Sequence, residues 1–470
     1  MNRPMKRSNN FKRFLIISFI TAFPVFVFQK CTIDNQKANL YQEILKYTDD
    51  IKVINTHEHQ RRPDEFGFDT VGFYHILGQT YLYHDLVSSG INYSNSETTG
   101  KNNKNRLWQQ YGGPLDYSRA TSYYGHLIKG FQKLYDFNDM YFNESNVSAL
   151  NAQIIKNYSN YPDWFNSAFE KAGFELIFLD RYWNSLECNI DTNYYATVIH
   201  INNMVLAASN RPDADEKLEF IYKKANEEGH SINTLDDYLN YCDIIFQRNV
   251  EQKAVVVKSS LAYARTIEFK DVSYEEAKQL FAKPSESLSW EEATLIQDYV
   301  FHWFIKKSIE NNLPVQIHTG YLAGNGNQLE NSNPMKLVNL IRRYPDANFV
   351  LLHGGYPWTS EFIALGKMFS NVYLDLVWLP QISREKAVLA FDEMLDCVPY
   401  NKIFWGGDCA FIEEAAGSLE YGKSIVAETL SKRIERGLLS KDVALEIAER
   451  IFRENAVEVF RLEQILGRDF

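Results

Sequence analysis

From residue 173 onward, short continuous apolar runs alternate with longer amphipathic stretches, and this alternation limits the fold more than any other feature. A strand that is apolar at nearly every position has both faces buried, as parallel strands covered by helices do. The runs that we assign to such strands are Phe174–Leu179, Lys253–Val257, Pro314–Ile317, Asn348–Leu352, Val372–Leu376 and Ile403–Trp405. The sequence therefore predicts an α/β fold built on a parallel sheet.

Helical patterns separate these runs. We expect helices at Glu291–Asn311, Pro334–Arg343 and Arg384–Leu395, and two long amphipathic helices, Tyr421–Glu435 and Lys441–Asn455, close the chain. The number of units and the length of 470 residues favour a closed (β/α)8 TIM barrel over an open doubly wound sheet. No GxGxxG or P-loop motif follows the first strand, which also weighs against the open sheet.

The chain before residue 173 is organised differently. After a polar linker near residues 32–38, Ile51–Asn55 forms an apolar run that we take as the first strand. Residues 64–170 hold few strand signals and an Asn- and Ser-rich loop at 91–105, and we interpret them as a mostly helical insertion. Helical patterns within it are His126–Tyr135, Val147–Tyr158 and Asp163–Ala172. We therefore expect a single barrel domain over residues 38–470 that hosts this insertion.

Residues 1–31 have the pattern of an export signal or an N-terminal anchor. Basic residues between Arg3 and Arg13 precede the apolar run Phe14–Phe28, which is short for a membrane span. Cys31 follows and would suit a lipoprotein signal, although Phe28-Gln29-Lys30 lacks the small residues that such processing needs. We expect an exported protein, periplasmic or membrane-anchored through its N-terminus, and the sequence leaves its oligomeric state open.

The charge pattern excludes one class of partner. The net charge is −11 and no basic stripe follows residue 13, so nucleic acid is not an expected partner. Apolar residues make up 45% of the chain, enough for a sizeable core. None of the five cysteines belongs to a CxxC pair, so no zinc ribbon is predicted. A small molecule is the expected partner.

Four polar segments stand where predicted strands end. They are Asn55-Thr56-His57-Glu58-His59, His318-Thr319-Gly320, His353-Gly354-Gly355 and Gly406-Gly407-Asp408. Two histidines two residues apart on an extended chain point to the same side, so both imidazoles can reach one cation. Strand ends meet on one face of a barrel. A single histidine at a strand end is usually structural, but together these residues predict a divalent metal site.

These segments resemble the amidohydrolase superfamily, whose members carry HxH after strand 1, His after strands 5 and 6, and Asp after strand 8. The resemblance spans roughly residues 50–465 and looks closest to the amidohydrolase-related branch of metal-dependent hydrolases and decarboxylases. It implies that His57, His59, His318 and Asp408 bind the metal. It also implies that Asp408 takes a proton from the nucleophilic water, with His353 as a general acid–base or a carbonyl polariser.

Lys258, Tyr263 and Arg265 follow the run that we count as strand 4. By the same resemblance Lys258 could be a carboxylated bridge between two metals; it could also contact the substrate or be a solvated lysine. We favour a substrate contact, and hence one metal over two, with Zn²⁺ preferred and Mn²⁺ as the alternative. Tyr263 and Arg265 are assigned to substrate binding, because the guanidinium fork of an arginine binds carboxylates.

The expected function is a metal-dependent hydrolase that acts on a small, carboxylated carbonyl compound through a metal-activated water. A decarboxylase or a uronate-isomerase-like enzyme on the same fold is the alternative within enzymes. A non-catalytic exported binding lipoprotein is the alternative of another class. The sequence fixes neither the substrate nor the bond that is cleaved.

Overall fold

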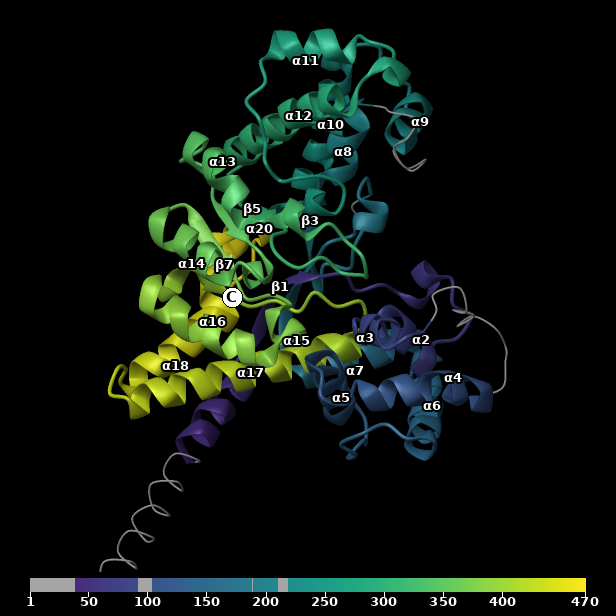
Figure 1. The fold of residues 1–470 in the computed structure, drawn as a ribbon, viewed down its shortest axis with the longest axis vertical. Coiled ribbons are helices and arrows are strands. Elements are labelled where there is room, and N and C mark those ends of the chain that lie inside the picture. The colour runs from purple at the N-terminus through teal and green to yellow at the C-terminus, as the bar shows by residue number, and fades with distance from the viewer. Residues whose placement is uncertain (1–38, 92–103, 188, 210–218) are drawn as a thin grey trace, which may run out of the picture.

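The computed structural model describes residues 39–91, 104–187, 189–209 and 219–470. Eight parallel strands form one sheet in which each strand pairs with the next along the chain. Helices lie around these strands (Figure 1). The strands are β1 Val53–Glu58, β2 Phe174–Leu179, β3 Tyr195–His200, β4 Val256–Ser259, β5 Val315–Ile317, β6 Phe349–Leu351, β7 Val372–Asp375 and β8 Ile403–Phe404. This order is that of a TIM barrel, and the predicted fold is confirmed.

The ring closes through the loop that follows β8. The N–H of Thr56 donates to the carbonyl of Trp405 at 3.5 Å, and the N–H of Asp408 donates to the carbonyl of His57 at 2.8 Å. The N–H of His59 donates to the carbonyl of Cys409 at 3.0 Å. Because β8 has only two residues, this loop supplies most of the contact with β1. The segment around Asp408 is therefore fixed to the first strand.

The outer helices begin at polar caps. Thr234 and Ser289 accept hydrogen bonds from backbone N–H groups in the first turns of α10 (Leu235–Glu251) and α12 (Trp290–Glu310), which satisfies donors that a helix start leaves free. Completely buried apolar residues such as Val315 and Phe349 form the core between strands and helices. The main outer helices are α10 Leu235–Glu251, α12 Trp290–Glu310, α13 Val338–Arg343, α14 Thr359–Met368, α16 Arg384–Cys397, α17 Ile412–Glu435 and α18 Lys441–Glu449.

Strand β3 was not among the predicted runs. Its sequence Tyr-Ala-Thr-Val-Ile-His has only a short apolar stretch, and Asn193 and Tyr194 precede it rather than a glycine or proline. The strand is nevertheless buried at all positions after Tyr195, because β2 and β4 flank it. Its last residue, His200, stands at the same end of the barrel as Lys258, its partner on β4.

Between β1 and β2 the described chain is helical. Figure 1 shows these helices together at one end of the molecule, beside α17. They are α2 Phe73–Gln79, α3 Leu82–Ser88, α4 Lys104–Tyr117, α5 Ser122–Leu134, α6 Glu144–Tyr158 and α7 Tyr161–Ala172. The helical patterns expected between residues 126 and 172 correspond to α5, α6 and α7.

Helices α5 and α17 cross with their backbones in close contact. A Cβ atom on Gly130 would overlap the carbonyl oxygen of Glu413, and one on Gly417 would overlap the carbonyl oxygen of His126. The side chain of Glu413 is buried and accepts hydrogen bonds from the hydroxyls of Tyr135 at 2.6 Å and Tyr158 at 2.9 Å. The helices that follow β1 are thus attached to the helix that begins just after Asp408.

In the part of the chain that the structure describes, no helix is both long and apolar enough to cross a bilayer. The predicted export signal at residues 1–31, including Cys31, lies outside the described residues. The described cysteines, Cys242, Cys397 and Cys409, are free.

The close crossing of α5 and α17 predicts that one methyl group added at Gly130 lowers the stability of the protein. Gly130→Ala should destabilise the protein by about 1–3 kcal/mol, because the added carbon meets rigid backbone. Lys129→Ala, at an exposed position next to it on α5, is the control and should change stability by less than about 0.5 kcal/mol. Urea unfolding followed by circular dichroism measures both. Equal stability of the two variants would contradict the close contact.

Candidate metal centre

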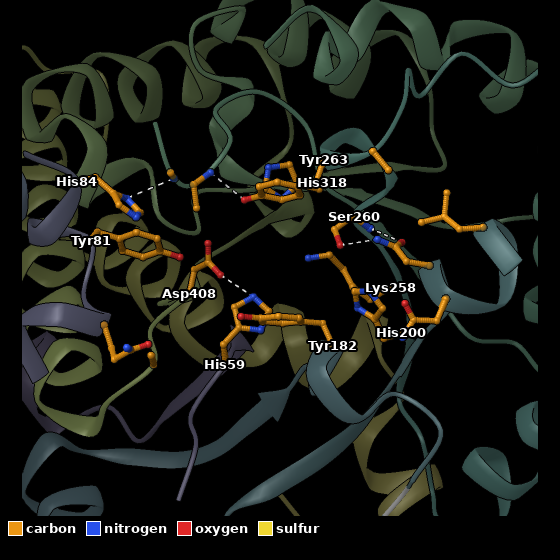
Figure 2. A pocket seen from close by; sticks show the side chains of 18 of the residues that line it. His59, Tyr81, His84, Tyr182, His200, Lys258, Ser260, Tyr263, His318 and Asp408 are labelled. Carbon is orange, nitrogen blue, oxygen red and sulfur yellow. Dashed lines mark hydrogen bonds and ion pairs between the residues drawn. The ribbon is translucent and has the colours of Figure 1, made fainter. Parts of the chain in front are cut away.

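A cavity of about 570 Å³ opens at the end of the barrel where the strands finish. Strand ends, the loop after β8 and the helices that follow β1 all contribute side chains to it. In Figure 2 the amine of Lys258, the carboxylate of Asp408 and the ring of His59 face the same open space. Other residues that line it include Tyr81, His84, Tyr182, His200, Asn202, Ser260, Tyr263, His318 and Glu414.

Strand β1 brings two imidazoles to one carboxylate. Alternate residues of a strand share a face, so His57 and His59 point to the same side. The distance from His57 Nε2 to Asp408 Oδ1 is 3.2 Å, and that from His59 Nε2 to the same oxygen is 3.1 Å. His57 and Asp408 are buried, whereas His59 is partly open to the cavity. Both imidazole nitrogens therefore lie close to the same carboxylate oxygen.

The partner of the second ring nitrogen orients His59. Its Nδ1 lies 2.8 Å from the backbone carbonyl of Asp180, which can only accept, so Nδ1 carries the proton. This leaves the Nε2 lone pair directed at the point shared with Asp408. A backbone or carboxylate partner on the second nitrogen is the usual way in which metal-binding imidazoles are fixed.

The separation of each imidazole nitrogen from the Asp408 oxygen fits ligands of one divalent metal. Ligands about 2.0–2.1 Å from a tetrahedral zinc ion lie about 3.3 Å apart, close to the separations of 3.1 and 3.2 Å found here. Two imidazole nitrogens and a carboxylate oxygen suit zinc, manganese, cobalt or iron better than calcium. The carboxylate of Asp180 is a further candidate, because His57, His59 and Asp180 offer ligand atoms within 4.8 Å of one another.

Burial and neighbouring charges shift the pKa values of His57, His59 and Asp408 in different ways. Burial, followed by the nearby Lys258, lowers the pKa of His57 to about 4. Burial also acts to lower the pKa of His59, but Asp408 and Asp180 outweigh it and raise that pKa. Burial alone would raise the pKa of the Asp408 carboxyl, yet its close contacts with His57 and His59 hold that pKa well below its usual range. Asp408 is therefore an anion at neutral pH.

His318 and His353 form a hydrogen-bonded pair beside this cluster. His318 Nε2 lies 2.8 Å from the carbonyl of Tyr321, so it carries the proton, and His318 Nδ1 accepts from His353 Nε2 at 2.9 Å. Both nitrogens of His318 have these partners, and His318 is not among the described residues whose ligand atoms lie within 4.8 Å of one another, so its role as a metal ligand stays a prediction. Burial is the main reason that the pKa of His318 falls to about 3.

His353 turns its other nitrogen toward the carboxylate. His353 Nδ1 has no hydrogen-bond partner and lies 3.8 Å from Asp408 Oδ2. The residue is completely buried, and burial followed by His318 lowers its pKa well below the usual value. His353 is therefore a neutral imidazole near Asp408 Oδ2, whereas His57 and His59 approach Oδ1.

Lys258 and Tyr263 both line the cavity. Lys258 is only 1% exposed, and its Nζ lies 3.1 Å from His57 Nε2 and 3.8 Å from Asp180 Oδ2. Burial lowers its pKa, while Asp180 and Asp408 act to raise it. The hydroxyl of Tyr263 accepts a hydrogen bond from the N–H of Ala323 at 2.8 Å, and its own proton stays available for a ligand. These positions are compatible with substrate contact.

Arg265 requires a correction. It is 4% exposed, does not line the cavity, and its guanidinium pairs with Asp298 at 2.5 Å and with Gln297 at 3.1 Å. The N–H groups of its guanidinium donate to residues of α12, because the chain turns away from the cavity after Tyr263 and places Arg265 against that helix. The assignment of Arg265 to a substrate carboxylate is therefore wrong, and its position indicates a structural role.

Sequence reasoning missed two polar residues of the site. Asp180 directly follows β2, and its Oδ1 accepts a hydrogen bond from His200 Nδ1 at 2.8 Å. Asp180 could have been found from the rule that polar residues after strands face the cavity. His200 could not, since its strand was not recognised. Both are buried, and His200 lines the cavity.

Comparison with known sequences agrees with this geometry. Residues 290–462 match a family described as Amidohydrolase. They include His318, His353 and Asp408, and the predicted amidohydrolase resemblance is confirmed. A 161-residue stretch is 32% identical to protein fluG of Emericella nidulans, covering 34% of this chain and 18% of that protein.

Solved structures share the fold over nearly the whole chain. Glucuronate isomerase from Caulobacter crescentus matches with a TM-score of 0.75 at 15% identity, covering 91% of this chain and 95% of its own. Uronate isomerase from Thermotoga maritima matches with a TM-score of 0.73 at 13% identity, covering 90% and 97%. A Lactobacillus casei protein, provisionally named a metal-dependent hydrolase, matches with a TM-score of 0.61 at 16% identity, covering 90% and 98%. At these identities the likeness establishes the TIM-barrel fold alone.

The geometry predicts different outcomes for two histidines. His57→Ala should abolish stoichiometric metal binding, because it removes one of the candidate ligands. His353→Ala should keep the metal and reduce turnover by about 10²–10⁴-fold, the usual contribution of general acid–base assistance. Elemental analysis of the purified variants measures the first effect. Equal loss of metal in both variants would contradict the assignment of His353.

The corrected role of Arg265 also makes a prediction. Arg265→Met should destabilise the protein by about 3–5 kcal/mol, because it leaves a buried carboxylate unpaired. Adding Asp298→Asn removes that charge and should restore part of the loss in urea unfolding. Metal content should not change in either variant. A loss of metal without loss of stability would contradict the structural role and support a role for Arg265 in the site.

Proposed function

We propose that the chain is a metal-dependent hydrolase that acts on a small, carboxylated carbonyl compound through an activated water. The observation that carries this proposal is the approach of His57 Nε2 and His59 Nε2 to the same oxygen, Asp408 Oδ1, beside the cavity. The amidohydrolase match of residues 290–462 supports it. A binding protein without turnover has no evident need for this set of ligand atoms at a cavity wall.

His57, His59 and Asp408 would hold the metal, with His318 as a ligand only if it gives up its contact with His353. When bound, a divalent ion supplies Lewis acidity, which polarises a carbonyl and acidifies water. Zn²⁺ is our first choice for this ion, and Mn²⁺ is the alternative. We expect one ion rather than two, because Lys258 Nζ lies only 3.1 Å from His57 Nε2.

Proton transfer falls to Asp408 and His353. His57 and His59 approach Asp408 at Oδ1, which leaves Oδ2 to accept a proton from the attacking water. His353 Nδ1 lies 3.8 Å from that oxygen and can carry the proton onward to the leaving group. Its hydrogen bond with His318 fixes the ring orientation that this transfer needs.

Substrate orientation falls to Lys258 and Tyr263. The correction of Arg265 leaves Lys258 as the cation that can meet a substrate carboxylate within the described lining of the cavity. The hydroxyl of Tyr263 can donate to a second oxygen. A substrate with one carboxylate and a nearby carbonyl or hydroxyl would use both groups.

Isomerisation of a uronic acid is the second candidate. It is favoured by the extent of the structural likeness, since the two matches with TM-scores of 0.75 and 0.73 are a glucuronate and a uronate isomerase. Such a reaction also needs a metal site, a carboxylate contact and a proton carrier. Decarboxylation at the same metal is a further alternative that the experiment below separates.

Metal analysis joined to a turnover screen tests the proposal. The protein should contain about one divalent ion per chain and hydrolyse a member of a panel of carboxylated lactones, esters and amides. Chelation should abolish turnover, and Zn²⁺ or Mn²⁺ should restore it. Hydrolysis of an ester or lactone releases acid, whereas uronate isomerisation produces a ketose and decarboxylation releases carbon dioxide. A metal-loaded protein that forms only ketose would replace the hydrolase by the isomerase, and metal-independent turnover would overturn both.

A further inference from the structure

The loop that carries Asp408 has an unusual backbone. Asp408 has a φ of +63°, in the left-handed region that residues other than glycine rarely adopt. Two glycines precede it, and a Cβ atom on Gly407 would overlap the carboxylate of Glu58. Such a conformation persists only when its surroundings hold it in place. The position of the Asp408 carboxylate therefore depends on what fastens this loop.

Strand β1 fastens three consecutive N–H groups of the loop. The N–H of Gly407 donates to Asn55 Oδ1 at 2.9 Å, and the N–H of Asp408 donates to the carbonyl of His57 at 2.8 Å. The N–H of Cys409 donates to Glu58 Oε2. The amide of Asn55 in turn donates to Glu58 Oε1 at 2.6 Å. Two side chains of one strand therefore act as a single hydrogen-bonded unit.

Both side chains are completely buried. Burying a carboxylate costs free energy unless hydrogen bonds compensate it, and here those bonds come from Asn55 and from the loop itself. The same strand carries the two metal-facing imidazoles. One strand therefore carries two ligands and holds the third in place.

We propose that Asn55 and Glu58 are positioning residues that hold Asp408 against His57 and His59 and thereby set the metal affinity of the site. The inference rests on the proposed metal centre. It goes further by assigning part of the metal affinity to two side chains that contact no metal. Groups that orient a ligand in this way usually change metal affinity by about 10–100-fold when they are removed.

The test measures the binding of Zn²⁺ to the full chain by competition with a chromophoric chelator, so it does not depend on turnover. Glu58→Gln keeps the size of the side chain but replaces one acceptor oxygen by an NH₂ group that cannot accept from Cys409 or Asn55. We expect the affinity for Zn²⁺ to fall by about 10–100-fold. Glu413→Gln is the matched control, since Glu413 is also a buried carboxylate with two hydrogen bonds but lies on α17 against tyrosines. It should keep the affinity of the unchanged protein.

A double-substitution cycle separates positioning from a general structural effect. If Glu58 acts through Asp408, the loss caused by Glu58→Gln should disappear in an Asp408→Asn background. A loss of the same size in both backgrounds would overturn the proposal. Should Glu58→Gln fail to fold, Asn55→Asp decides, because it keeps the acceptor for the Gly407 N–H and loses the donor to Glu58. Unchanged Zn²⁺ affinity in that folded variant would also overturn the proposal.

The outcomes distinguish this inference from the proposed function. If the unchanged protein does not bind Zn²⁺ or Mn²⁺, both are wrong. If it binds and His57→Ala does not, while Glu58→Gln and Asn55→Asp bind as tightly as the unchanged protein, the metal centre stands and the positioning role falls.

Discussion

The contact between β1 and the loop after β8 is the interaction on which the rest of the site depends. It closes the barrel where the last strand is too short to do so, and it joins His57 and His59 to Asp408. In a ring of parallel strands, the first and last strands meet only if every intermediate strand keeps its tilt and spacing. The geometry at the proposed metal centre therefore depends on the whole ring, although the residues that form it lie on two neighbouring segments.

Helix α17 connects the Asp408 loop to the helices between β1 and β2. It begins at Ile412, just after the Asp408 loop, and its backbone contacts α5 through Gly130 and Gly417. Glu414, in its first turn, accepts hydrogen bonds from the N–H groups of Tyr81 and Ala410. The same helix thus meets the loop that carries a ligand and the segment that forms one wall of the cavity.

The sequence could predict what depends on short-range pattern. Apolar runs predicted seven of the eight strands, and polar residues directly after them predicted His57, His59, His318, His353 and Asp408 at one face of the barrel. It could not predict which atoms pair, because hydrogen-bond partners come from different strands. His318 pairs with His353, and Arg265 pairs with Asp298, because of how loops turn after the strands end. Asp180 and His200 become meaningful only when β2 and β3 are known to be neighbours.

Strand ends and helical segments both line the cavity, and substitutions in them have different effects on the site. The residues that face the proposed metal stand on strand ends, where the ring of hydrogen bonds tolerates little movement. Tyr81 and His84 reach the cavity from α3 and the turn before it, which belong to a segment outside that ring. A substitution in this segment can alter the shape of the chamber while the distances among His57, His59 and Asp408 stay as they are. During evolution, substrate selectivity can therefore change while the chemistry at the metal stays the same.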